Sequence, residues 1–262
     1  MLGRTRGAVM GRIGFGAMQL PTGVERRESS VAVLRRAVEL GVPLVDTAYL
    51  YGGGANEELV AAALHPYGET VVTTKVGVSG SGPLSEWRLD GRPESLRRQV
   101  DGCLRRLRVE RIALLQLHRI DPDVPADDQV GTLAELRDGG KAERLGLSEV
   151  TVAELAAARA ITEIASVQNR YNLVDRTHEP VLRECERAGI MFLPWRPLAH
   201  DGGAVSEVAA QSGASPAQVA LAWLLARSPV MLPIPGTASL THLAENVAAE
   251  SLRLSPEQSA RL

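Results

Sequence analysis

The sequence predicts an α/β fold, a single (β/α)8 barrel of the TIM type that spans residues 1–262. From about residue 30 onward, short apolar runs of β type alternate with longer helical patterns, which indicates βα units and a parallel sheet. Eight such units in 262 residues take about 33 residues each, close to the size expected for a barrel of ~250 residues. Because no Ser/Pro/Gly-rich linker interrupts the series, one domain is favoured over two.

Each predicted strand is a short apolar run of β type that is followed by a polar or glycine-containing segment. In chain order the predicted strands are Arg12–Gly16, Pro43–Asp46, Thr70–Val76, Ile112–His118, Glu143–Leu147, Ala165–Gln168, Ile190–Pro194 and Val230–Pro233. The rival architecture is a doubly wound open sheet, whose G-x-G-x-x-G fingerprint follows the first strand. The chain has only the first two of these glycines, Gly14 and Gly16, so the barrel is preferred.

The helices between the strands carry start and stop signals. Capping-box pairs and first-turn prolines predict where helices begin, and glycines predict where they end. The pairs are Thr151 with Glu154, Ser215 with Gln218 and Ser255 with Gln258, the prolines are Pro93 and Pro216, and the glycines are Gly41, Gly139 and Gly189. The mixed-charge segments Ser95–Arg108 and Pro180–Arg187 are interpreted as solvent-facing helices on the barrel exterior.

Charge and cysteine content exclude several classes of function. Lys and Arg total 29 against 31 Asp and Glu, a net charge of -2, so no basic field is present to bind nucleic acid or an anionic membrane. No apolar run reaches the length of a membrane span and no signal peptide is evident, which predicts a soluble, cytoplasmic protein. Cys103 and Cys185 have no CxxC partner, so neither a disulfide framework nor a metal site is predicted.

Polar side chains close several of the apolar runs. In a barrel, chemistry belongs at the carboxyl ends of the strands, where these residues stand. They are Asp46, Lys75, His118, Ser148 and Gln168. Because Asp46, Lys75 and His118 end successive strands, we expect them to converge at the barrel mouth, partly removed from water.

Tyr51 follows Asp46 by five residues and adds a candidate proton donor to this group. A tyrosine with a pKa of about 10 is a poor acid at neutral pH unless a nearby cation favours its phenolate. Lys75 is the candidate cation, and Asp46 the candidate partner that holds Lys75 in place.

Ordered sequence blocks across nearly the whole chain resemble those of the aldo-keto reductase family. Asp46-Thr-Ala-Tyr-Leu-Tyr51-Gly, followed by Asn56-Glu57-Glu58, is similar to the family signature Asp-Thr-Ala-x-x-Tyr-Gly with its trailing glutamate. Later blocks that match in order are Thr74-Lys75-Val-Gly, Leu114-Leu-Gln-Leu-His118-Arg-Ile-Asp121, Gly139-Gly-Lys141, Leu145-Gly-Leu-Ser148, Val167-Gln168-Asn-Arg-Tyr-Asn172 and Leu232-Pro-Ile-Pro-Gly236-Thr. The chain resembles in particular a bacterial, actinobacterial-type, NADP-dependent branch.

The resemblance implies reduction of an aldehyde or ketone by hydride from a nicotinamide. Tyr51 would donate the proton to the developing alkoxide, Asp46 would hold Lys75, and His118 would orient the carbonyl. Such an acid and donor aimed at the oxygen that gains charge lower the barrier to hydride transfer. The implied partner is a small-molecule carbonyl compound, and the sequence does not indicate an oligomeric state.

The resemblance also implies a set of cofactor contacts. These are Gly16, Ala17, Met18, Ser148, Gln168, Trp195, Arg196, Pro197, Leu198, Gly236, Thr237, His242, Glu245 and Asn246. Ser148 and Gln168 match positions that bind the carboxamide, and Trp195 matches the aromatic residue that stacks on the nicotinamide. NADP(H) is the expected cofactor. NAD(H) is a second possibility, because His242 stands where many members have an arginine for the 2′-phosphate.

Two departures from the family pattern are evident. Glu149 follows Ser148 where an asparagine is common, so the carboxamide is expected to rely more on Gln168. The connections after Met18 and after Ala199 are short, which predicts an open cofactor channel and fast exchange of the dinucleotide. Candidate substrate contacts are Tyr49, Trp87 and Arg119, an aromatic and polar mixture that does not choose among carbonyl compounds.

Three alternative functions stay open on the sequence alone. The first is a nucleotide-binding regulatory protein on the same barrel with little turnover. The second is a metal-dependent barrel hydrolase that uses Asp46 and His118 as ligands, although no HxH follows the first strand. The third is a reductase recruited for a biosynthetic step on one specialised substrate.

Overall fold

A computed structural model of the chain describes residues 11–80 and 86–262. Its centre is a sheet of seven strands in the order β1-β2-β3-β6-β7-β8-β9, and every neighbouring pair is parallel. The strands of this sheet are β1 (Phe15–Gly16), β2 (Leu44–Asp46), β3 (Val71–Val76), β6 (Ile112–Leu117), β7 (Ala142–Ser148), β8 (Ser166–Gln168) and β9 (Met191–Phe192). A separate antiparallel pair, β4 (Val78–Ser79) and β5 (Arg88–Leu89), follows β3.

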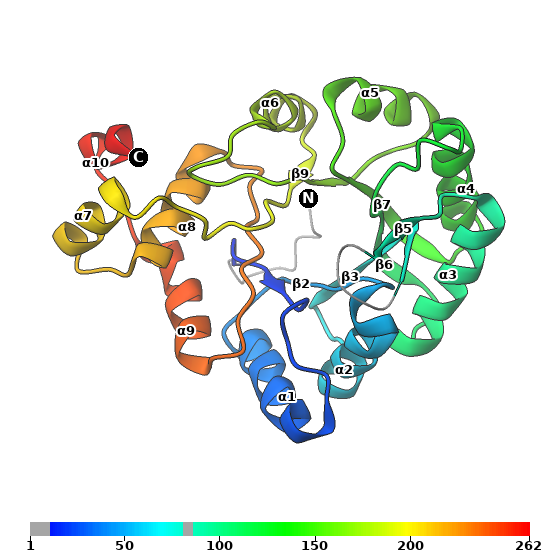
Figure 1. Cartoon of the computed structure of the whole chain (residues 1–262), viewed down its shortest axis with the longest axis horizontal. Coiled ribbons are helices and arrows are strands. Elements are labelled where there is room, and N and C mark those ends of the chain that lie inside the picture. The colour runs from blue at the N-terminus through cyan, green and yellow to red at the C-terminus, as the bar shows by residue number, and fades with distance from the viewer. Residues whose placement is uncertain (1–10, 81–85) are drawn as a thin grey trace.

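Helices surround the strands on the outside (Figure 1). Because the strands are parallel, their carboxyl ends meet at one end of the molecule. The α-helices are α1 (Val24–Glu39), α2 (Ala55–Leu64), α3 (Pro93–Leu107), α4 (Ala126–Asp138), α5 (Val152–Ile161), α6 (Glu179–Ala188), α7 (Gly203–Ser212), α8 (Pro216–Arg227), α9 (Leu240–Ala248) and α10 (Pro256–Arg261). Two 3-10 helices, η1 (Tyr51–Gly54) and η3 (Ala249–Ser251), complete the described elements.

The predicted helix signals are confirmed. All three capping boxes form, at the starts of α5, α8 and α10, with the side-chain oxygen of the cap accepting from the backbone three residues on. The two predicted prolines open α3 and α8. Gly139 and Gly189 are the carboxyl-terminal caps of α4 and α6, and Gly41 follows the cap of α1 with a φ of +83°. Local hydrogen-bonding chemistry therefore fixes where these helices begin and end.

The predicted closed barrel of eight strands is not formed, because the eighth predicted strand, Val230–Pro233, is not a strand. Its ladder pairing is reduced to one isolated bridge, between Phe192 and Met231. Pro233 and Pro235 have no backbone N–H and cannot donate to a neighbouring strand. Residues 230–235, here called the seam segment, therefore interrupt a ring that the sequence predicts to be continuous.

The seam segment nevertheless lies between β9 and the amino-terminal strand. On one side, the N–H of Phe192 donates to the carbonyl of Val230 at 2.9 Å. On the other side, Gly14 donates to the Pro233 carbonyl at 2.8 Å and Gly16 to the Pro235 carbonyl at 3.1 Å. Prolines can still accept hydrogen bonds, so the segment joins the two edges of the sheet with few bonds.

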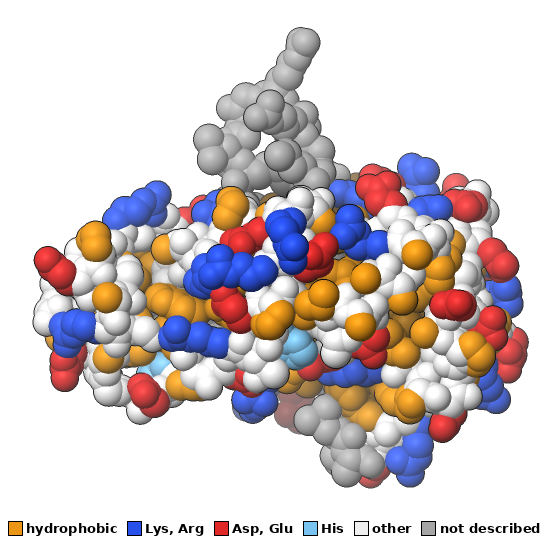
Figure 2. Space-filling view, turned by 90° about the horizontal axis from the view of Figure 1, so that it is seen from above, with side chains coloured by type: hydrophobic (Ala, Val, Ile, Leu, Met, Phe, Trp, Pro, Cys, Tyr) orange, Lys and Arg blue, Asp and Glu red, His pale blue; other side chains and the backbone are white. Residues whose placement is uncertain are grey.

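On the face of the molecule in Figure 2, Lys and Arg side chains are interspersed with Asp and Glu side chains. That face therefore carries no large field of one sign, in keeping with the net charge of -2. None of the helices in the described part of the chain combines the length and the apolar character that crossing a bilayer requires.

Candidate active site

The carboxyl ends of three adjacent strands bring together the residues predicted to do the chemistry. Asp46 is the last residue of β2, Lys75 lies near the end of β3, and His118 directly follows β6. Because β3 pairs with both β2 and β6, these side chains reach one point inside the ring. All three are buried, and Tyr51 joins them from η1. We call these four residues the Lys75 cluster.

Lys75 is the centre of this cluster. Its Nζ donates to Asp46 Oδ2 at 2.6 Å, to the backbone carbonyl of Thr47 at 2.9 Å and to Tyr51 Oη at 3.2 Å. An ammonium has three N–H donors, so these partners use all of them. The lysine is thereby fixed beside the phenol oxygen of Tyr51, as predicted from the sequence.

Protonation states in the cluster follow from burial and from the neighbouring charges. Burial raises the pKa of Tyr51, and the Lys75 ammonium, which favours the phenolate, offsets that rise only in part. Burial by itself would lower the pKa of Lys75, but Asp46 and Tyr51 outweigh it, and the pKa of Lys75 is raised. Lys75 thus acts in the predicted direction without bringing the pKa of Tyr51 below its ordinary value. Tyr51 is a neutral phenol that holds its proton.

His118 is a neutral imidazole in this environment. Burial, together with the positive charges of Lys75 and Arg119, lowers its pKa well below the usual range. Its Nδ1 is buried and has no hydrogen-bond partner among the described residues. Its ring lies 5.9 Å from the Tyr51 ring, edge to face, and 5.8 Å from the Trp87 ring. A neutral imidazole with unused hydrogen-bonding capacity beside Tyr51 is suited to orient a polar substrate atom.

Two glutamines fix Asp46 from the side opposite Lys75. Gln168 Nε2 donates to Asp46 Oδ1 at 2.8 Å, and Gln116 Nε2 lies 3.4 Å from the same oxygen while donating to Thr73 Oγ1 at 2.8 Å. Gln116 is not among the site residues predicted from the sequence. Strand periodicity could have found it, because Gln116 stands two residues before His118 and so faces the same side of the sheet.

A second ion pair, between buried Glu57 and partly exposed Arg106, holds the loop that carries Tyr51. Glu57 of α2 is fully buried, and its Oε2 accepts from Arg106 Nε at 2.7 Å. Its other oxygen accepts from the hydroxyl of Thr74, the neighbour of Lys75, at 2.6 Å. A Cβ at Gly54, whose φ is +98°, would lie 2.5 Å from Arg106 Nε. The absence of a side chain at Gly54 therefore lets the loop pack directly against Arg106.

Gln168 and Ser148, the residues predicted to bind the carboxamide, each have one hydrogen-bonding group left unused: an acceptor on Gln168 and a donor on Ser148. Gln168 uses its N–H on Asp46, which leaves its carbonyl oxygen as an acceptor. Ser148 Oγ accepts from Arg119 Nη1 at 3.0 Å, which leaves its own proton as a donor. One acceptor and one donor match the NH₂ and the oxygen of a carboxamide.

Two of the predicted dinucleotide residues, Gly16 of β1 and Gly236 directly after the seam segment, lie side by side. A Cβ on Gly236 would lie 2.6 Å from the Gly16 carbonyl oxygen, so only glycine permits this approach. Ala17 is fully buried and Met18 is 51% exposed at the rim. Thr237 Oγ1 accepts from the backbone N–H of Ser239, the residue that caps α9.

The remaining predicted cofactor residues come from α9 and from the segment after β9. His242 is exposed on the first turn of α9, where its backbone N–H donates to the cap, and further along the helix Glu245 is half-buried and Asn246 buried. After β9, Trp195 is half-buried and donates its indole N–H to Glu149 Oε1 at 2.6 Å. The residues that follow it are Arg196, exposed with a φ of +52°, Pro197, buried, and Leu198, half-buried.

Of the three candidate substrate residues, Trp87 and Arg119 lie at the cluster and Tyr49 does not. Trp87 is half-buried beside His118 and packs against the apolar group that includes Tyr51. Tyr49 instead lies against α3, where the Arg106 guanidinium is 4.8 Å from its ring centre. A substrate contact by Tyr49 therefore has no support from this geometry.

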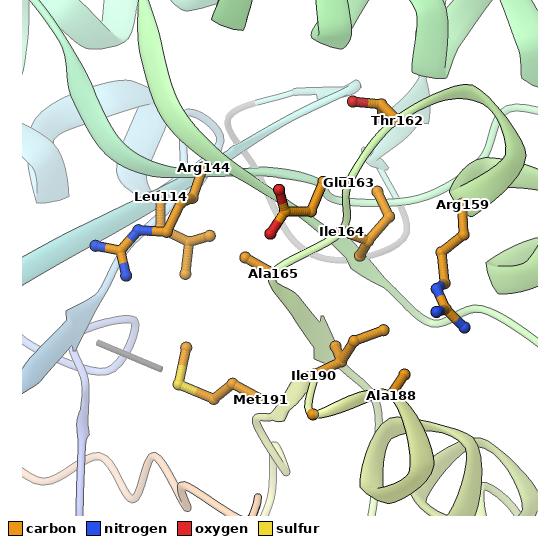
Figure 3. Close-up of a pocket in the computed structure, with 11 residues that line it drawn as sticks. Leu114, Arg144, Arg159, Thr162, Glu163, Ile164, Ala165, Ala188, Ile190 and Met191 are labelled. Carbon is orange, nitrogen blue, oxygen red and sulfur yellow. The ribbon is translucent and has the colours of Figure 1, made fainter. Parts of the chain in front are cut away.

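A cavity of about 340 Å³ lies at the opposite end of the sheet from the cluster. Figure 3 shows its lining, which comes from the amino ends of β6 to β9 and from the segments that lead into them. Arg144, Glu163 and Met191 are among the residues that line it. Because active sites of parallel sheets form at the carboxyl ends of strands, this cavity is not the candidate active site.

Comparisons with known proteins agree with the geometry. A model of the Aldo/keto reductase family matches residues 12–206 and 201–262. The chain is 44% identical over 264 residues to an uncharacterized oxidoreductase of Schizosaccharomyces pombe, covering 97% of this chain and 86% of that protein. It is 38% identical over 262 residues to pyridoxine 4-dehydrogenase of Escherichia coli, covering 94% and 91%.

Solved structures are similar over nearly the whole chain. An aldo-keto reductase from Klebsiella pneumoniae in complex with NADPH superimposes with a TM-score of 0.83 at 27% identity, covering 96% of this chain and 89% of that one. The glycerol dehydrogenase AKR11B4 of Gluconobacter oxydans gives a TM-score of 0.85 at 25% identity, covering 96% and 90%.

Proposed function

The chain belongs to the aldo/keto reductase family, and we propose that the Lys75 cluster carries out its reaction. The protein is an NAD(P)H-dependent oxidoreductase that converts aldehydes or ketones to alcohols. The observation that supports the assignment of the cluster is the single ammonium of Lys75, which bonds at once to Asp46 and to Tyr51 Oη.

The residues around the cluster fit a nicotinamide dinucleotide. Ser148 offers a donor and Gln168 an acceptor for the carboxamide, and the close approach of Gly236 to Gly16 presents backbone without side chains at this place. Trp195 would supply the stacking surface for the nicotinamide ring. When bound, the reduced cofactor supplies the hydride that adds to the carbonyl carbon.

Tyr51 is the proposed proton donor. As hydride reaches the carbon, the carbonyl oxygen gains negative charge, and the neutral phenol transfers its proton to that oxygen. The Lys75 ammonium, 3.2 Å from Tyr51 Oη, stabilises the phenolate that is left. Neutral His118 donates to the same carbonyl oxygen and fixes its direction. Tyr51 then recovers a proton from solvent, so that one hydride and one proton give the alcohol.

An aromatic aldehyde is the proposed substrate class. Trp87 beside His118 provides a flat apolar wall, and Arg119 provides a cation near Tyr51. The E. coli relative is named for oxidoreduction at carbon 4 of pyridoxine, so pyridoxal, which carries an aldehyde there, is the first compound to test.

The cofactor is proposed to be NADP(H), in accord with the NADPH-bound neighbour. His242 is exposed on the first turn of α9, where it can contact a 2′-phosphate, but it lacks the fixed charge of an arginine. NAD(H) use therefore stays a prediction. So do the actinobacterial-type branch, a cytoplasmic location and the fast exchange of dinucleotide through the short loops.

A Tyr51→Phe variant tests the assignment. We expect kcat for pyridoxal reduction, followed by NADPH absorbance, to fall by about 10²–10⁴-fold, with the Kd for NADPH changed less than about threefold. Tyr49→Phe is the matched control, because Tyr49 lies two residues away but packs against α3, and it should retain wild-type turnover. Equal activity of Tyr51→Phe and wild type would contradict the role of Tyr51.

The alternative functions are less well supported. A regulatory protein would bind NADPH without turnover on any carbonyl compound, which the same assay detects, and family membership does not favour it. A metal-dependent hydrolase would place a cation on Asp46, whose Oδ2 already accepts from the Lys75 ammonium. That ammonium would repel a divalent ion at the same oxygen.

A further inference from the structure

Glu149 occupies an unusual backbone position beside the proposed cofactor site. It directly follows Ser148 at the end of β7, and its φ is +57°. Residues other than glycine rarely adopt this left-handed conformation, and those that do are mostly Asn and Asp. A glutamate held there is strained, and such strain persists only where the surrounding contacts over-determine it.

Those contacts centre on one carboxylate oxygen. Glu149 Oε1 accepts from the indole Nε1 of Trp195 at 2.6 Å and from the backbone N–H of Arg170 at 2.6 Å. Its Oε2 lies 3.7 Å from Nε2 of His178. Burial alone would raise the pKa of Glu149, but these donors, with the charge of Arg119, lower it to about 2. The acceptor is therefore a full carboxylate at neutral pH.

The same network restrains Trp195 from several directions. The backbone N–H of Trp195 donates to the Asn169 carbonyl at 3.2 Å, and the Arg170 guanidinium is 5.8 Å from the indole ring. Asn169 in turn bonds to both backbone groups of Val150. The backbone hydrogen bond fixes the position of the Trp195 main chain, but it does not fix the rotation of the side chain about χ1 and χ2. Packing against the apolar group that includes Leu193, Leu232 and Ile234 limits that rotation, and the bond from Nε1 to Glu149 fixes the far edge of the indole.

We propose that Glu149 is a positioning residue that sets the plane of the Trp195 indole for stacking on the nicotinamide ring. The inference rests on the proposed function, because it takes Trp195 as the stacking residue. The positioning role explains why position 149 is a glutamate. A carboxylate can accept the hydrogen bonds of the indole N–H and the Arg170 amide on the same oxygen, and a glutamate has one methylene more than asparagine with which to reach Trp195 in the segment after β9. Carboxamide binding then falls to Ser148 and Gln168.

The first test needs no cofactor. In protein labelled with ¹⁵N-tryptophan, Trp195→Phe identifies the indole N–H resonance of Trp195. We expect that N–H to exchange with solvent at least tenfold faster in Glu149→Ala than in wild type, and Glu149→Gln, which keeps an acceptor of the same length, to restore most of the protection. Glu154→Ala is the matched control, because the Glu154 carboxylate bonds to Thr151 in the capping box of α5.

The second test measures the Kd for NADPH. Glu149→Ala and Trp195→Phe should each weaken binding about tenfold, with Glu149→Gln within threefold of wild type. The double variant Glu149→Ala/Trp195→Phe should be no weaker than the weaker single variant, since both changes remove one effect. Trp195→Phe keeps Glu149 and its bond to Arg170, so it tests the stack even if Glu149→Ala folds poorly.

The outcomes separate this inference from the proposed function. Unchanged exchange of the Trp195 N–H in Glu149→Ala, additive losses in the double variant, or wild-type affinity in Trp195→Phe would each overturn the positioning role while leaving the reductase assignment intact. Failure of the wild-type protein to bind either NADPH or NADH would instead overturn the proposed function, and the stacking role with it.

Discussion

Lys75 and Lys141 are the only two lysines of the chain, and each pairs with an aspartate in a different environment. Lys75 and Asp46 are 0% and 4% exposed at the side chain, whereas Lys141 and Asp101 are 41% and 45% exposed. Both distances are short, 2.6 Å and 2.5 Å. Because water screens the second pair and not the first, their contributions to stability should differ strongly although their geometries are alike.

Asp46→Asn should therefore destabilise the protein far more than Asp101→Asn. Removing the carboxylate leaves the Lys75 ammonium unpaired in the interior, and we expect the free energy of unfolding to fall by about 3–5 kcal/mol, against less than about 1 kcal/mol for Asp101→Asn. Urea denaturation measures both. Because Lys75 also loses its anchor, kcat should fall only in Asp46→Asn. Equal losses of stability in the two variants would contradict the burial argument.

The rate of reduction should be insensitive to pH across the neutral range. In the proposed reaction Tyr51 is the acid, and its raised pKa keeps it protonated until well into alkaline solution, while the lowered pKa of His118 keeps the imidazole neutral. We expect kcat/KM for reduction to be flat between about pH 6 and pH 9. A profile measured in buffers of constant ionic strength checks this. A rise or fall centred near pH 6.5 would show that His118 titrates in the free enzyme.

Single residues at strand ends were predictable from the sequence, but side-chain directions in the loops were not. Asp46, Lys75 and His118 follow from the rule that places chemistry at the carboxyl ends of parallel strands. Tyr49 stands two residues from Tyr51, yet it turns outward to Arg106 because the backbone from 48 to 54 is a tight turn without regular periodicity. Sequence spacing alone does not determine which of the two tyrosines enters the site.

At the scale of elements, η1 depends on a contact from α3. The turn contains Gly52 and Gly53, with φ of 60° and 62°, so its own backbone is permissive and does little to fix Tyr51. Arg106 supplies the missing restraint, since it bonds to the buried Glu57 at the start of α2 and covers Gly54. Tyr51, the proposed proton donor, is thus placed by an ion pair between two helices.

Arg106→Met should loosen this restraint. It leaves the Glu57 carboxylate buried without its cation, so we expect a loss of about 3–5 kcal/mol and a fall in Tm of about 6–20 °C. The exposed neighbour Arg105 offers a control, and Arg105→Met should change Tm by no more than about 2 °C. Differential scanning calorimetry records both values. A Tm of Arg106→Met close to wild type would mean that the pair is not a structural restraint.

The elements themselves were largely predictable, apart from the last strand. Seven of the eight predicted strands overlap strands of the sheet, because alternating apolar runs and capping signals define them locally. Val230–Pro233 has the same apolar character, but pairing requires N–H groups, and Pro233 cannot supply one. The two prolines of the seam segment are stronger evidence than its hydrophobicity, and they predict an isolated bridge instead of a strand.

At the scale of the whole molecule, the two ends of the described chain are tied together near the seam. Glu250 in η3 accepts from the backbone N–H of Arg12 and, at 2.7 Å, from that of Ile13. Arg12 also donates through Nη2 to the Ser228 carbonyl at 2.8 Å. The amino-terminal strand is thus held by side chains where the sheet supplies few ladder bonds.

Glu250→Ala should weaken this closure specifically. The Arg12 and Ile13 amides lose their acceptor, which costs about 1–3 kcal/mol, and hydrogen exchange measured by mass spectrometry should accelerate in peptides covering 12–16 and 230–236. Glu250→Gln keeps an acceptor oxygen and should behave like wild type. Glu257→Ala, at an exposed position of α10, is the control. Acceleration spread evenly over the protein would contradict a local role.

The seam segment also has a consequence for the chain during its synthesis, because it is made long after β1. The second edge of β1 is completed by carbonyls of Pro233 and Pro235, which leave the ribosome about 220 residues later, or roughly 11–44 s at ~5–20 residues per second. Throughout that interval β1 exposes an unpaired edge. Being only two residues long, it offers too few amides to recruit another nascent chain, so its brevity protects the protein during synthesis.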